Sequence, residues 1–150
     1  MATRKPRDPV DEVLLSAVRW AMAISVRAAD ELGDLSAVQL RALTILQGNA
    51  RGNLNGLAAA MGVTVSTASR LVDRLVAAGL VDRRPSPQTR REISLSLTPA
   101  GRGRLQRYDR LRIVEARARL EAVPPDRRDS VLAALEQLVG DGAGPAPSQG

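Results

Sequence analysis

Apolar residues recur every three or four positions through most of the chain, the spacing of amphipathic helices. One long helix is predicted from about Pro9 to Leu32, with Gly33 as its stop. A second is predicted from Ser36, a natural N-cap, to the residue before Gly48, and a loop from there to Gly52. The apolar positions of the first helix are Val10, Val13, Leu14, Ala17, Val18, Ala21 and Ile24. Those of the second are Val38, Leu40, Leu43, Ile45 and Leu46.

The next segment, from Leu54 to Leu75, predicts two short helices joined by a sharp turn. Gly62 favours a backbone with positive φ at the turn, and Thr64 or Ser66 can cap the second helix. The inward positions are Leu57, Ala58 and Met61 on the first helix and Ala68, Leu71, Val72 and Leu75 on the second. The other faces of the second helix carry Thr67, Ser69, Arg70, Asp73 and Arg74. A helix held on one side and polar on the other suits a DNA major groove, which is about 12 Å wide.

A hairpin is predicted after this pair of helices. One strand covers Leu80 to Arg84 and the other Glu92 to Leu97, where Ile93, Leu95 and Leu97 alternate with serines. The polar turn between the strands carries Arg90 and Arg91 at its tip. These arginines are either solvated surface residues or side chains that enter a DNA minor groove. We favour the groove because the hairpin directly follows a candidate recognition helix.

Two further helices are predicted in the C-terminal third. Thr98 is an N-cap and Pro99 the first residue of a helix that runs to about Ala122, which Pro124-Pro125 ends. This helix has an apolar stripe of Leu105, Tyr108, Leu111, Val114 and Ala118. The last helix starts at about Asp126 and carries Val131, Leu132, Leu135, Leu138 and Val139. The predicted fold class is mainly α with a small β-hairpin wing.

Composition narrows the function classes. The chain has 150 residues, 1% aromatics and a net charge of +6, which favours a polyanionic partner. It has no cysteine and no histidine, so disulfides and thiol sensing are excluded, and we expect neither a metal nor another cofactor. The acidic pairs Asp11-Glu12 and Asp30-Glu31 diverge around a helix, so we expect no enzyme. No signal peptide or membrane-length apolar run is visible, which predicts a cytoplasmic protein.

The most specific run is Leu71–Arg84, followed by Arg90-Arg91 and Leu97–Gly101. With the order of helices around it, this run resembles the MarR family of winged-helix transcription regulators from Pro9 to Gly140. The resemblance implies a winged helix-turn-helix lobe over about 36–98 and dimerisation helices over about 10–32 and 99–140, together a domain over 10–140. A flexible basic arm over 1–9 and a disordered tail over 141–150 flank it.

The resemblance also implies roles for single residues. Base contacts in the major groove fall to Ser66, Thr67, Ser69 and Arg70, and phosphate contacts to Thr64 and Arg74. Arg90 matches the wing-tip arginine of the family, with Arg91 and Arg83 beside it. The family usually has an aspartate before that arginine, where it helps to hold the wing. Thr89 stands there in this chain, which leaves the pose of the arginine open.

The family implies a homodimer, formed through the first and last helices, that binds double-stranded DNA at a palindromic operator and usually represses. Two-fold symmetry places the half-sites about one helical turn, ~10 bp, apart. If the protein responds to a signal, the resemblance implies a small organic effector in a cleft between the dimerisation helices and the DNA-binding lobe. Arg19 and Trp20 are the candidates to line this cleft, although a core position is the favoured interpretation of Trp20. The alternative function is a winged-helix module that binds protein without specific DNA binding, for which an apolar or acidic wing tip would be expected.

Overall fold

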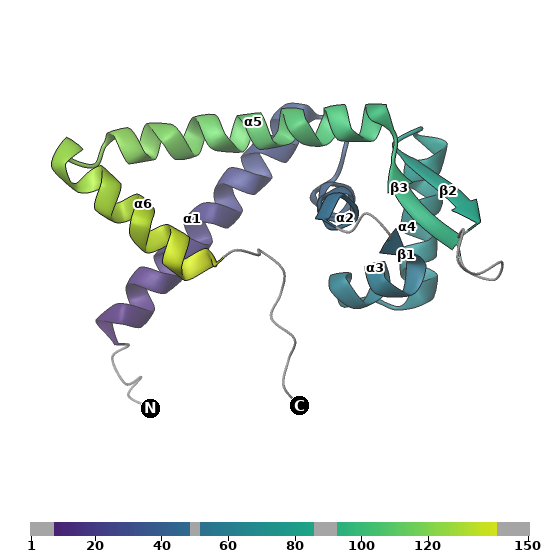
Figure 1. The fold of residues 1–150 in the computed structure, drawn as a ribbon, viewed down its shortest axis with the longest axis horizontal. Coiled ribbons are helices and arrows are strands. Elements are labelled where there is room, and N and C mark those ends of the chain that lie inside the picture. Colours follow the sequence, from purple (N-terminus) through teal and green to yellow (C-terminus); the bar gives the residue numbers. More distant parts are fainter. Residues whose placement is uncertain (1–7, 49–51, 86–92, 141–150) are drawn as a thin grey trace, which may run out of the picture.

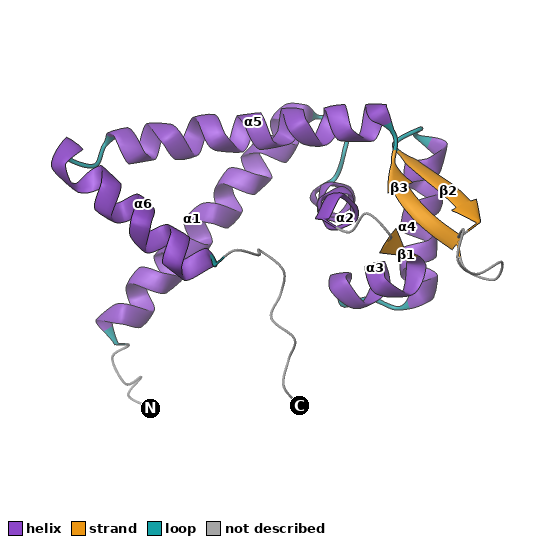
Figure 2. Ribbon diagram, viewed as in Figure 1, coloured by secondary structure: helices purple, strands orange, loops and turns teal. Residues whose placement is uncertain are grey.

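The computed structural model describes residues 8–48, 52–85 and 93–140, in which six helices and three short strands follow one another (Figure 1). A lobe built of the short helices and the strands lies at one end of the long helix α5, and α6 lies at the other end (Figure 1). Helix dominates and the strands form one small sheet (Figure 2), so the predicted fold class is confirmed. The elements are α1 (Pro9–Leu32), α2 (Ala37–Gly48), β1 (Gly52–Asn53), α3 (Leu54–Met61), α4 (Val65–Ala77), β2 (Val81–Pro85), β3 (Ile93–Leu97), α5 (Pro99–Glu121) and α6 (Pro125–Val139).

Local signals set the helix ends. Gly33 ends α1 with φ 77°, and its N–H donates to the Ala29 carbonyl. At the start of α2, the Ser36 N–H donates to the Gln39 side chain (2.9 Å) while the Gln39 N–H donates to Ser36 Oγ (3.3 Å). This reciprocal capping confirms Ser36 as the N-cap. Residue 8 of the expected arm is the N-cap of α1 and residue 9 its first residue, whereas residues 1–7 and the expected tail over 141–150 lie outside the described residues.

The sheet has the order β1-β3-β2, and both neighbours run antiparallel to β3. Val81 pairs with Leu97 and Arg83 with Leu95 on one side of β3, while Gly52 pairs with Leu95 on the other. The strand at Gly52–Asn53 corrects the expectation of a loop up to Gly52. A two-residue strand exists only because β3 offers it hydrogen-bonding groups, and no local pattern in a Gly-rich segment signals that partner.

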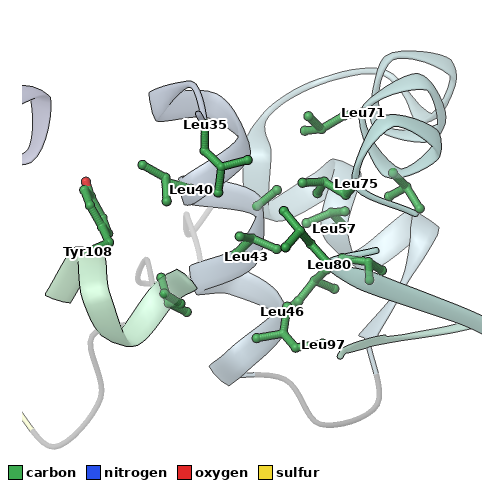
Figure 3. Close-up of a cluster of buried hydrophobic side chains, with 14 of the residues drawn as sticks. Leu35, Leu40, Leu43, Leu46, Leu57, Leu71, Leu75, Leu80, Leu97 and Tyr108 are labelled. Carbon is green, nitrogen blue, oxygen red and sulfur yellow. The ribbon is translucent and has the colours of Figure 1, made fainter. Parts of the chain in front are cut away.

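The lobe has a largely aliphatic core, to which α2, α3, α4, β2 and β3 contribute together with residues of α1 and α5 (Figure 3). Leu40 and Leu43 of α2 meet Leu57 of α3 and Leu75 of α4, and each of these side chains is almost fully buried. Tyr108 lies at the edge of this cluster, and its hydroxyl donates to the Ser25 carbonyl of α1 (3.3 Å). Two ion pairs, Arg27 with Glu115 and Arg104 with Asp34, also connect α5 to α1 and to the segment that follows it.

In the lobe, two apolar residues expected to face inward are exposed. Val38 is 56% exposed on the outer side of α2, and Ile93 is 47% exposed where β3 begins. Ile93 pairs with Pro85 at the far end of the hairpin, beyond the elements that cover Leu95 and Leu97. Periodicity identified the elements correctly, but the position of their neighbours decides which apolar side chains are covered.

The junction between β3 and α5 is tightly packed. Thr98 caps α5 as predicted: its Oγ1 accepts from the Gly101 N–H (3.0 Å) and donates to the Gly79 carbonyl (2.7 Å). The Thr98 N–H donates to the Leu80 carbonyl (3.0 Å). Gly101 is buried, and a Cβ added there would lie 2.1 Å from the Leu80 carbonyl oxygen. Hydrogen bonds and close packing of the segment Leu97–Gly101 therefore hold the start of α5 against the turn that follows α4.

Helices α1 and α6 leave much of their apolar surface uncovered. In α1 the exposed apolar residues include Val10, Val13, Leu14 and Val18, and none of the residues of α6 is buried. These two apolar stripes therefore exceed what the described part of the chain covers. Within the described part of the chain, no helix has the length and apolar character needed to cross a bilayer.

Candidate nucleic-acid interface

The helix-turn-helix forms as predicted between α3 and α4. Asn53 caps α3, its side chain accepting from the Gly56 N–H at 2.7 Å. Gly62 has φ 67° and its N–H donates to the Ala59 carbonyl, while the Val63 N–H donates to the Ala58 carbonyl. Ala58 of α3 is buried, and its small side chain permits close packing of the element that covers it. After this turn, the first residues of α4 are exposed to solvent.

Three hydroxyl groups lie together at the start of α4. Thr64 is the N-cap, so the structure selects Thr64 over Ser66 for this role. Its Oγ1 accepts from the Thr67 N–H (3.3 Å) and lies 2.9 Å from the Thr67 hydroxyl and 3.1 Å from the Ser66 hydroxyl. All three residues are exposed at the positive end of a helix dipole, a setting that attracts anions such as phosphates.

The two sides of α4 differ sharply. Ala68, Leu71, Val72 and Leu75 are buried against the core, as predicted. Ser69 is half-buried, whereas Arg70 and Arg74 are exposed, and their side chains form no ion pair or hydrogen bond with any residue that the structure describes. Helix α4 therefore presents two uncompensated guanidinium groups on a rigidly held element, beside the sheet at the end of the molecule farthest from α6 (Figure 1).

An ion pair connects α4 to the hairpin. Arg83 Nη2 of β2 lies 3.0 Å from Asp73 Oδ1 of α4, with side-chain exposures of 32% and 58%. The sequence pattern predicts an outward face for Asp73 but indicates no partner, because nothing local connects positions ten residues apart on different elements. The tip residues Thr89, Arg90 and Arg91 lie outside the described residues.

The two residues named for an effector cleft lie on α1. A groove of about 450 Å³ runs between α1 and α5 and is lined by Trp20, Ala21, Ile24, Asp109, Arg112, Ile113 and Ala116. Trp20 is 37% exposed, so its interpretation as a core residue is wrong for the single chain. Arg19 is exposed and is not among the lining residues. The Arg112 guanidinium lies 5.1 Å from the centre of the Tyr108 ring and 3.3 Å from Asp109.

The described residues contain no cluster of three or more acidic side chains that could hold a metal ion. The surface of the lobe instead presents hydroxyl groups and guanidinium groups around the start of α4. Such groups bind phosphates and base edges by charge and hydrogen bonding.

Comparisons with known proteins agree with this architecture. A sequence model of the MarR family matches residues 33–92. The crystal structure of Rv1404 from Mycobacterium tuberculosis is 34% identical, with 95% of this chain and 99% of that chain covered and a TM-score of 0.77. The HTH-type transcriptional regulator YfiV of Bacillus subtilis is 24% identical over 79% of each chain.

A third relative was solved together with DNA. This mutant of MepR from S. aureus, bound to an oligodeoxyribonucleotide, is 16% identical, with 89% of this chain and 97% of that chain covered and a TM-score of 0.66. At that identity the likeness concerns the fold alone. The family match over the helix-turn-helix and hairpin and the likeness to Rv1404 over nearly the whole chain give one conclusion: this chain belongs to the MarR family of transcriptional regulators.

Proposed function

We propose that the protein is a homodimeric repressor that binds a palindromic double-stranded DNA operator through α4 and the hairpin wing. The observation that carries this proposal is the exposed face of α4, where Arg70 and Arg74 have no acidic partner among the described residues. Two fixed cations beside a hydroxyl-rich helix start favour a polyanion. The MepR relative bound to an oligodeoxyribonucleotide shares this fold and supports the same role here.

The contacts divide by chemistry. We assign base edges to Ser66, Thr67, Ser69 and Arg70, because they occupy the first two turns of a helix that fits a major groove. Thr64 at the helix end and Arg74 farther along α4 are assigned to phosphates. Arg90 and Arg91 are assigned to the minor groove beside the wing. One terminal nitrogen of Arg83 forms the ion pair with Asp73, and the other N–H groups of the guanidinium are available for a phosphate.

The proposed dimer follows from the exposed apolar faces. Helices over about 10–32 and 99–140 would form the shared region, and the lobe over about 36–98 would face DNA. Uncovered apolar stripes on both α1 and α6 are unusual for a monomer and typical of a protein interface. A two-fold axis through this region would present two copies of α4 to a palindrome with half-sites about 10 bp apart.

Release by a small organic effector is part of the proposal. The groove beside Trp20 lies on the helices that would set the spacing of the two lobes. An effector that binds better to a dimer with wrongly spaced recognition helices lowers the population that fits DNA. Asp109 and Arg112 line the groove and are placed to meet a polar group of such a molecule, whereas Arg19, one residue before Trp20, is exposed outside it.

The test is fluorescence anisotropy with a labelled duplex from the DNA that flanks the gene, against a scrambled duplex, at about 50 and 200 mM salt. Arg70→Gln is the diagnostic variant. Arg119→Gln changes an arginine on α5 that is also exposed, removes the same charge far from α4 and is the matched control. We expect salt-sensitive binding that prefers the flanking duplex and that Arg70→Gln weakens at least about tenfold, with Arg119→Gln near wild type.

Two outcomes would contradict the proposal. Equal loss in both arginine variants would mean that net charge alone attracts DNA. No binding to either duplex, or to a random duplex library, by a folded protein would favour a winged helix that binds protein instead.

A further inference from the structure

The first turn of α4 contains an exposed apolar side chain among its hydroxyl groups. Val65 is the first residue of the helix and is 47% exposed, whereas Ala68, Leu71, Val72 and Leu75 on the same helix are buried. Val65 stands between Thr64 and Ser66, both exposed. The packing of the lobe therefore does not explain a branched apolar residue at this position.

The position of Val65 puts it where a recognition helix meets base edges. Side chains on a helix tilt toward its N-terminus, so those of the first turn extend past the helix end. In helix-turn-helix proteins these N-terminal residues are the ones that approach the bases. The neighbouring hydroxyls of Ser66 and Thr67 both bond to Thr64 Oγ1, which commits part of their hydrogen-bonding capacity to the cap. Val65 has no such internal contact to satisfy.

Only one base offers a valine an apolar group in the major groove. Thymine presents its C5-methyl there, whereas the other bases present donors and acceptors. Covering those polar edges with a valine would remove water from them without replacing its hydrogen bonds, which is unfavourable. Covering a methyl group removes apolar surface from water, which is favourable.

We propose that Val65 is a specificity-determining residue that selects a thymine in each operator half-site by contact with its C5-methyl group. This inference rests on the proposed DNA-binding function. It assigns a sequence preference to a residue that carries no charge and no hydrogen-bonding side chain. Arg70, farther along the helix, would supply the polar readout beside it.

The experiment starts with a duplex selected from a random library by the full-length protein. Each thymine of this duplex is then replaced by deoxyuridine, which removes the methyl group and nothing else. For one thymine per half-site we expect replacement to weaken binding about fourfold, the value of one methyl group removed from an apolar contact. Replacement in both half-sites would then weaken binding about fifteenfold.

Two valine variants complete the cycle. In Val65→Ala the deoxyuridine effect at that thymine should vanish, while binding to the deoxyuridine duplex stays close to wild type. The matched control is Val76→Ala, a 38% exposed valine in the last turn of α4, which should keep the full effect. Circular dichroism of both variants should match wild type, since both side chains are exposed.

The outcomes separate the inference from the function on which it rests. If selection enriches no sequence, the proposed function fails and the inference fails with it. If a sequence is enriched but no deoxyuridine weakens binding, DNA recognition holds and the role of Val65 is refuted. If the deoxyuridine effect persists in Val65→Ala, another residue contacts the methyl group and the inference is again refuted.

Discussion

The lobe and the long helices solve the burial of apolar residues in opposite ways. The lobe closes its own core: Leu40, Leu43 and Leu75 are fully buried by residues of the same chain. Helix α6 has an apolar face of similar composition, yet Leu138 is 71% exposed and no residue of the helix is buried. The core of the lobe is therefore filled within one chain, with help from the C-terminal part of α1 and the first turns of α5. The N-terminal part of α1 and the whole of α6 instead leave apolar surface uncovered, which a second chain would cover in the proposed dimer.

The largest effect should come from charges on the apolar face of α6. Leu135→Glu with Leu138→Glu would place four carboxylates in a two-fold interface, where unpaired charges are strongly unfavourable. We expect the dimer dissociation constant to rise at least about 100-fold, measured by sedimentation velocity, while the far-UV circular dichroism of the lobe persists.

The matched control is Ser130→Glu with Gln137→Glu, which adds the same charge to the opposite side of α6 by helical periodicity. This variant should remain a dimer. If the leucine variant also stays dimeric, or if wild type is a monomer at micromolar concentration, the comparison between the two regions is wrong. The leucine variant should also bind DNA more weakly, because the single lobe of a monomer contacts only one half-site.

A second test compares two positions of α2. Leu43→Ala removes a fully buried leucine from the lobe core, and we expect a loss of about 2–5 kcal/mol in the free energy of unfolding. Val38→Ala, on the 56% exposed side of the same helix, should change it by less than about 0.5 kcal/mol. Urea denaturation at one fixed protein concentration measures both. Equal losses would show that the outer face of α2 is covered in the dimer.

A third test concerns the junction at which the two regions meet. Gly101→Ala places a Cβ against the Leu80 carbonyl, and we expect a loss of about 1–3 kcal/mol in unfolding free energy. Gly103→Ala, two residues along α5 with open space around it, should instead stabilise the protein by about 0.5–1 kcal/mol. Thermal unfolding distinguishes the two variants, because Gly101→Ala should lower the melting temperature and Gly103→Ala should raise it. A neutral Gly101→Ala would mean that α5 moves freely against the turn after α4.

Local chemistry explains how much could be predicted from the sequence. Gly33, Ser36 and Thr98 each satisfy a helix end with their own backbone or side chain, so the ends of these helices follow from nearby residues. For the same reason the buried stripe of α4 and the turn at Gly62 were predicted correctly. Periodicity and capping together are sufficient wherever an element's neighbour in space is also its neighbour in sequence.

The features that were missed depend on partners distant in the sequence. The strand at Gly52 depends on pairing with Leu95, which lies far away in the sequence. Val38 stays 56% exposed because the described residues leave most of its side chain uncovered. Trp20 is a large aromatic residue of the kind that usually packs in a core, but it lies at a groove that the described part of the chain leaves open. In the candidate interface, the pairing of Asp73 with Arg83 likewise required the fold.

The smallest effect should come from that pair. An exposed ion pair contributes little, so a double-mutant cycle of Asp73→Asn and Arg83→Gln should give a coupling energy of about 0.2–1 kcal/mol that about 1 M salt removes. The pair Asp82–Arg84, at 3.4 Å within one strand, is the control and should couple more weakly.

DNA affinity gives a second measurement on the same variants. Asp73→Asn removes a negative charge beside the proposed interface and should raise affinity for any duplex, while Arg83→Gln should lower it. A coupling energy above about 2 kcal/mol would mean that the hairpin is held as firmly as the core of the lobe. The contrast between well-packed and weakly held regions would then apply only to α1 and α6.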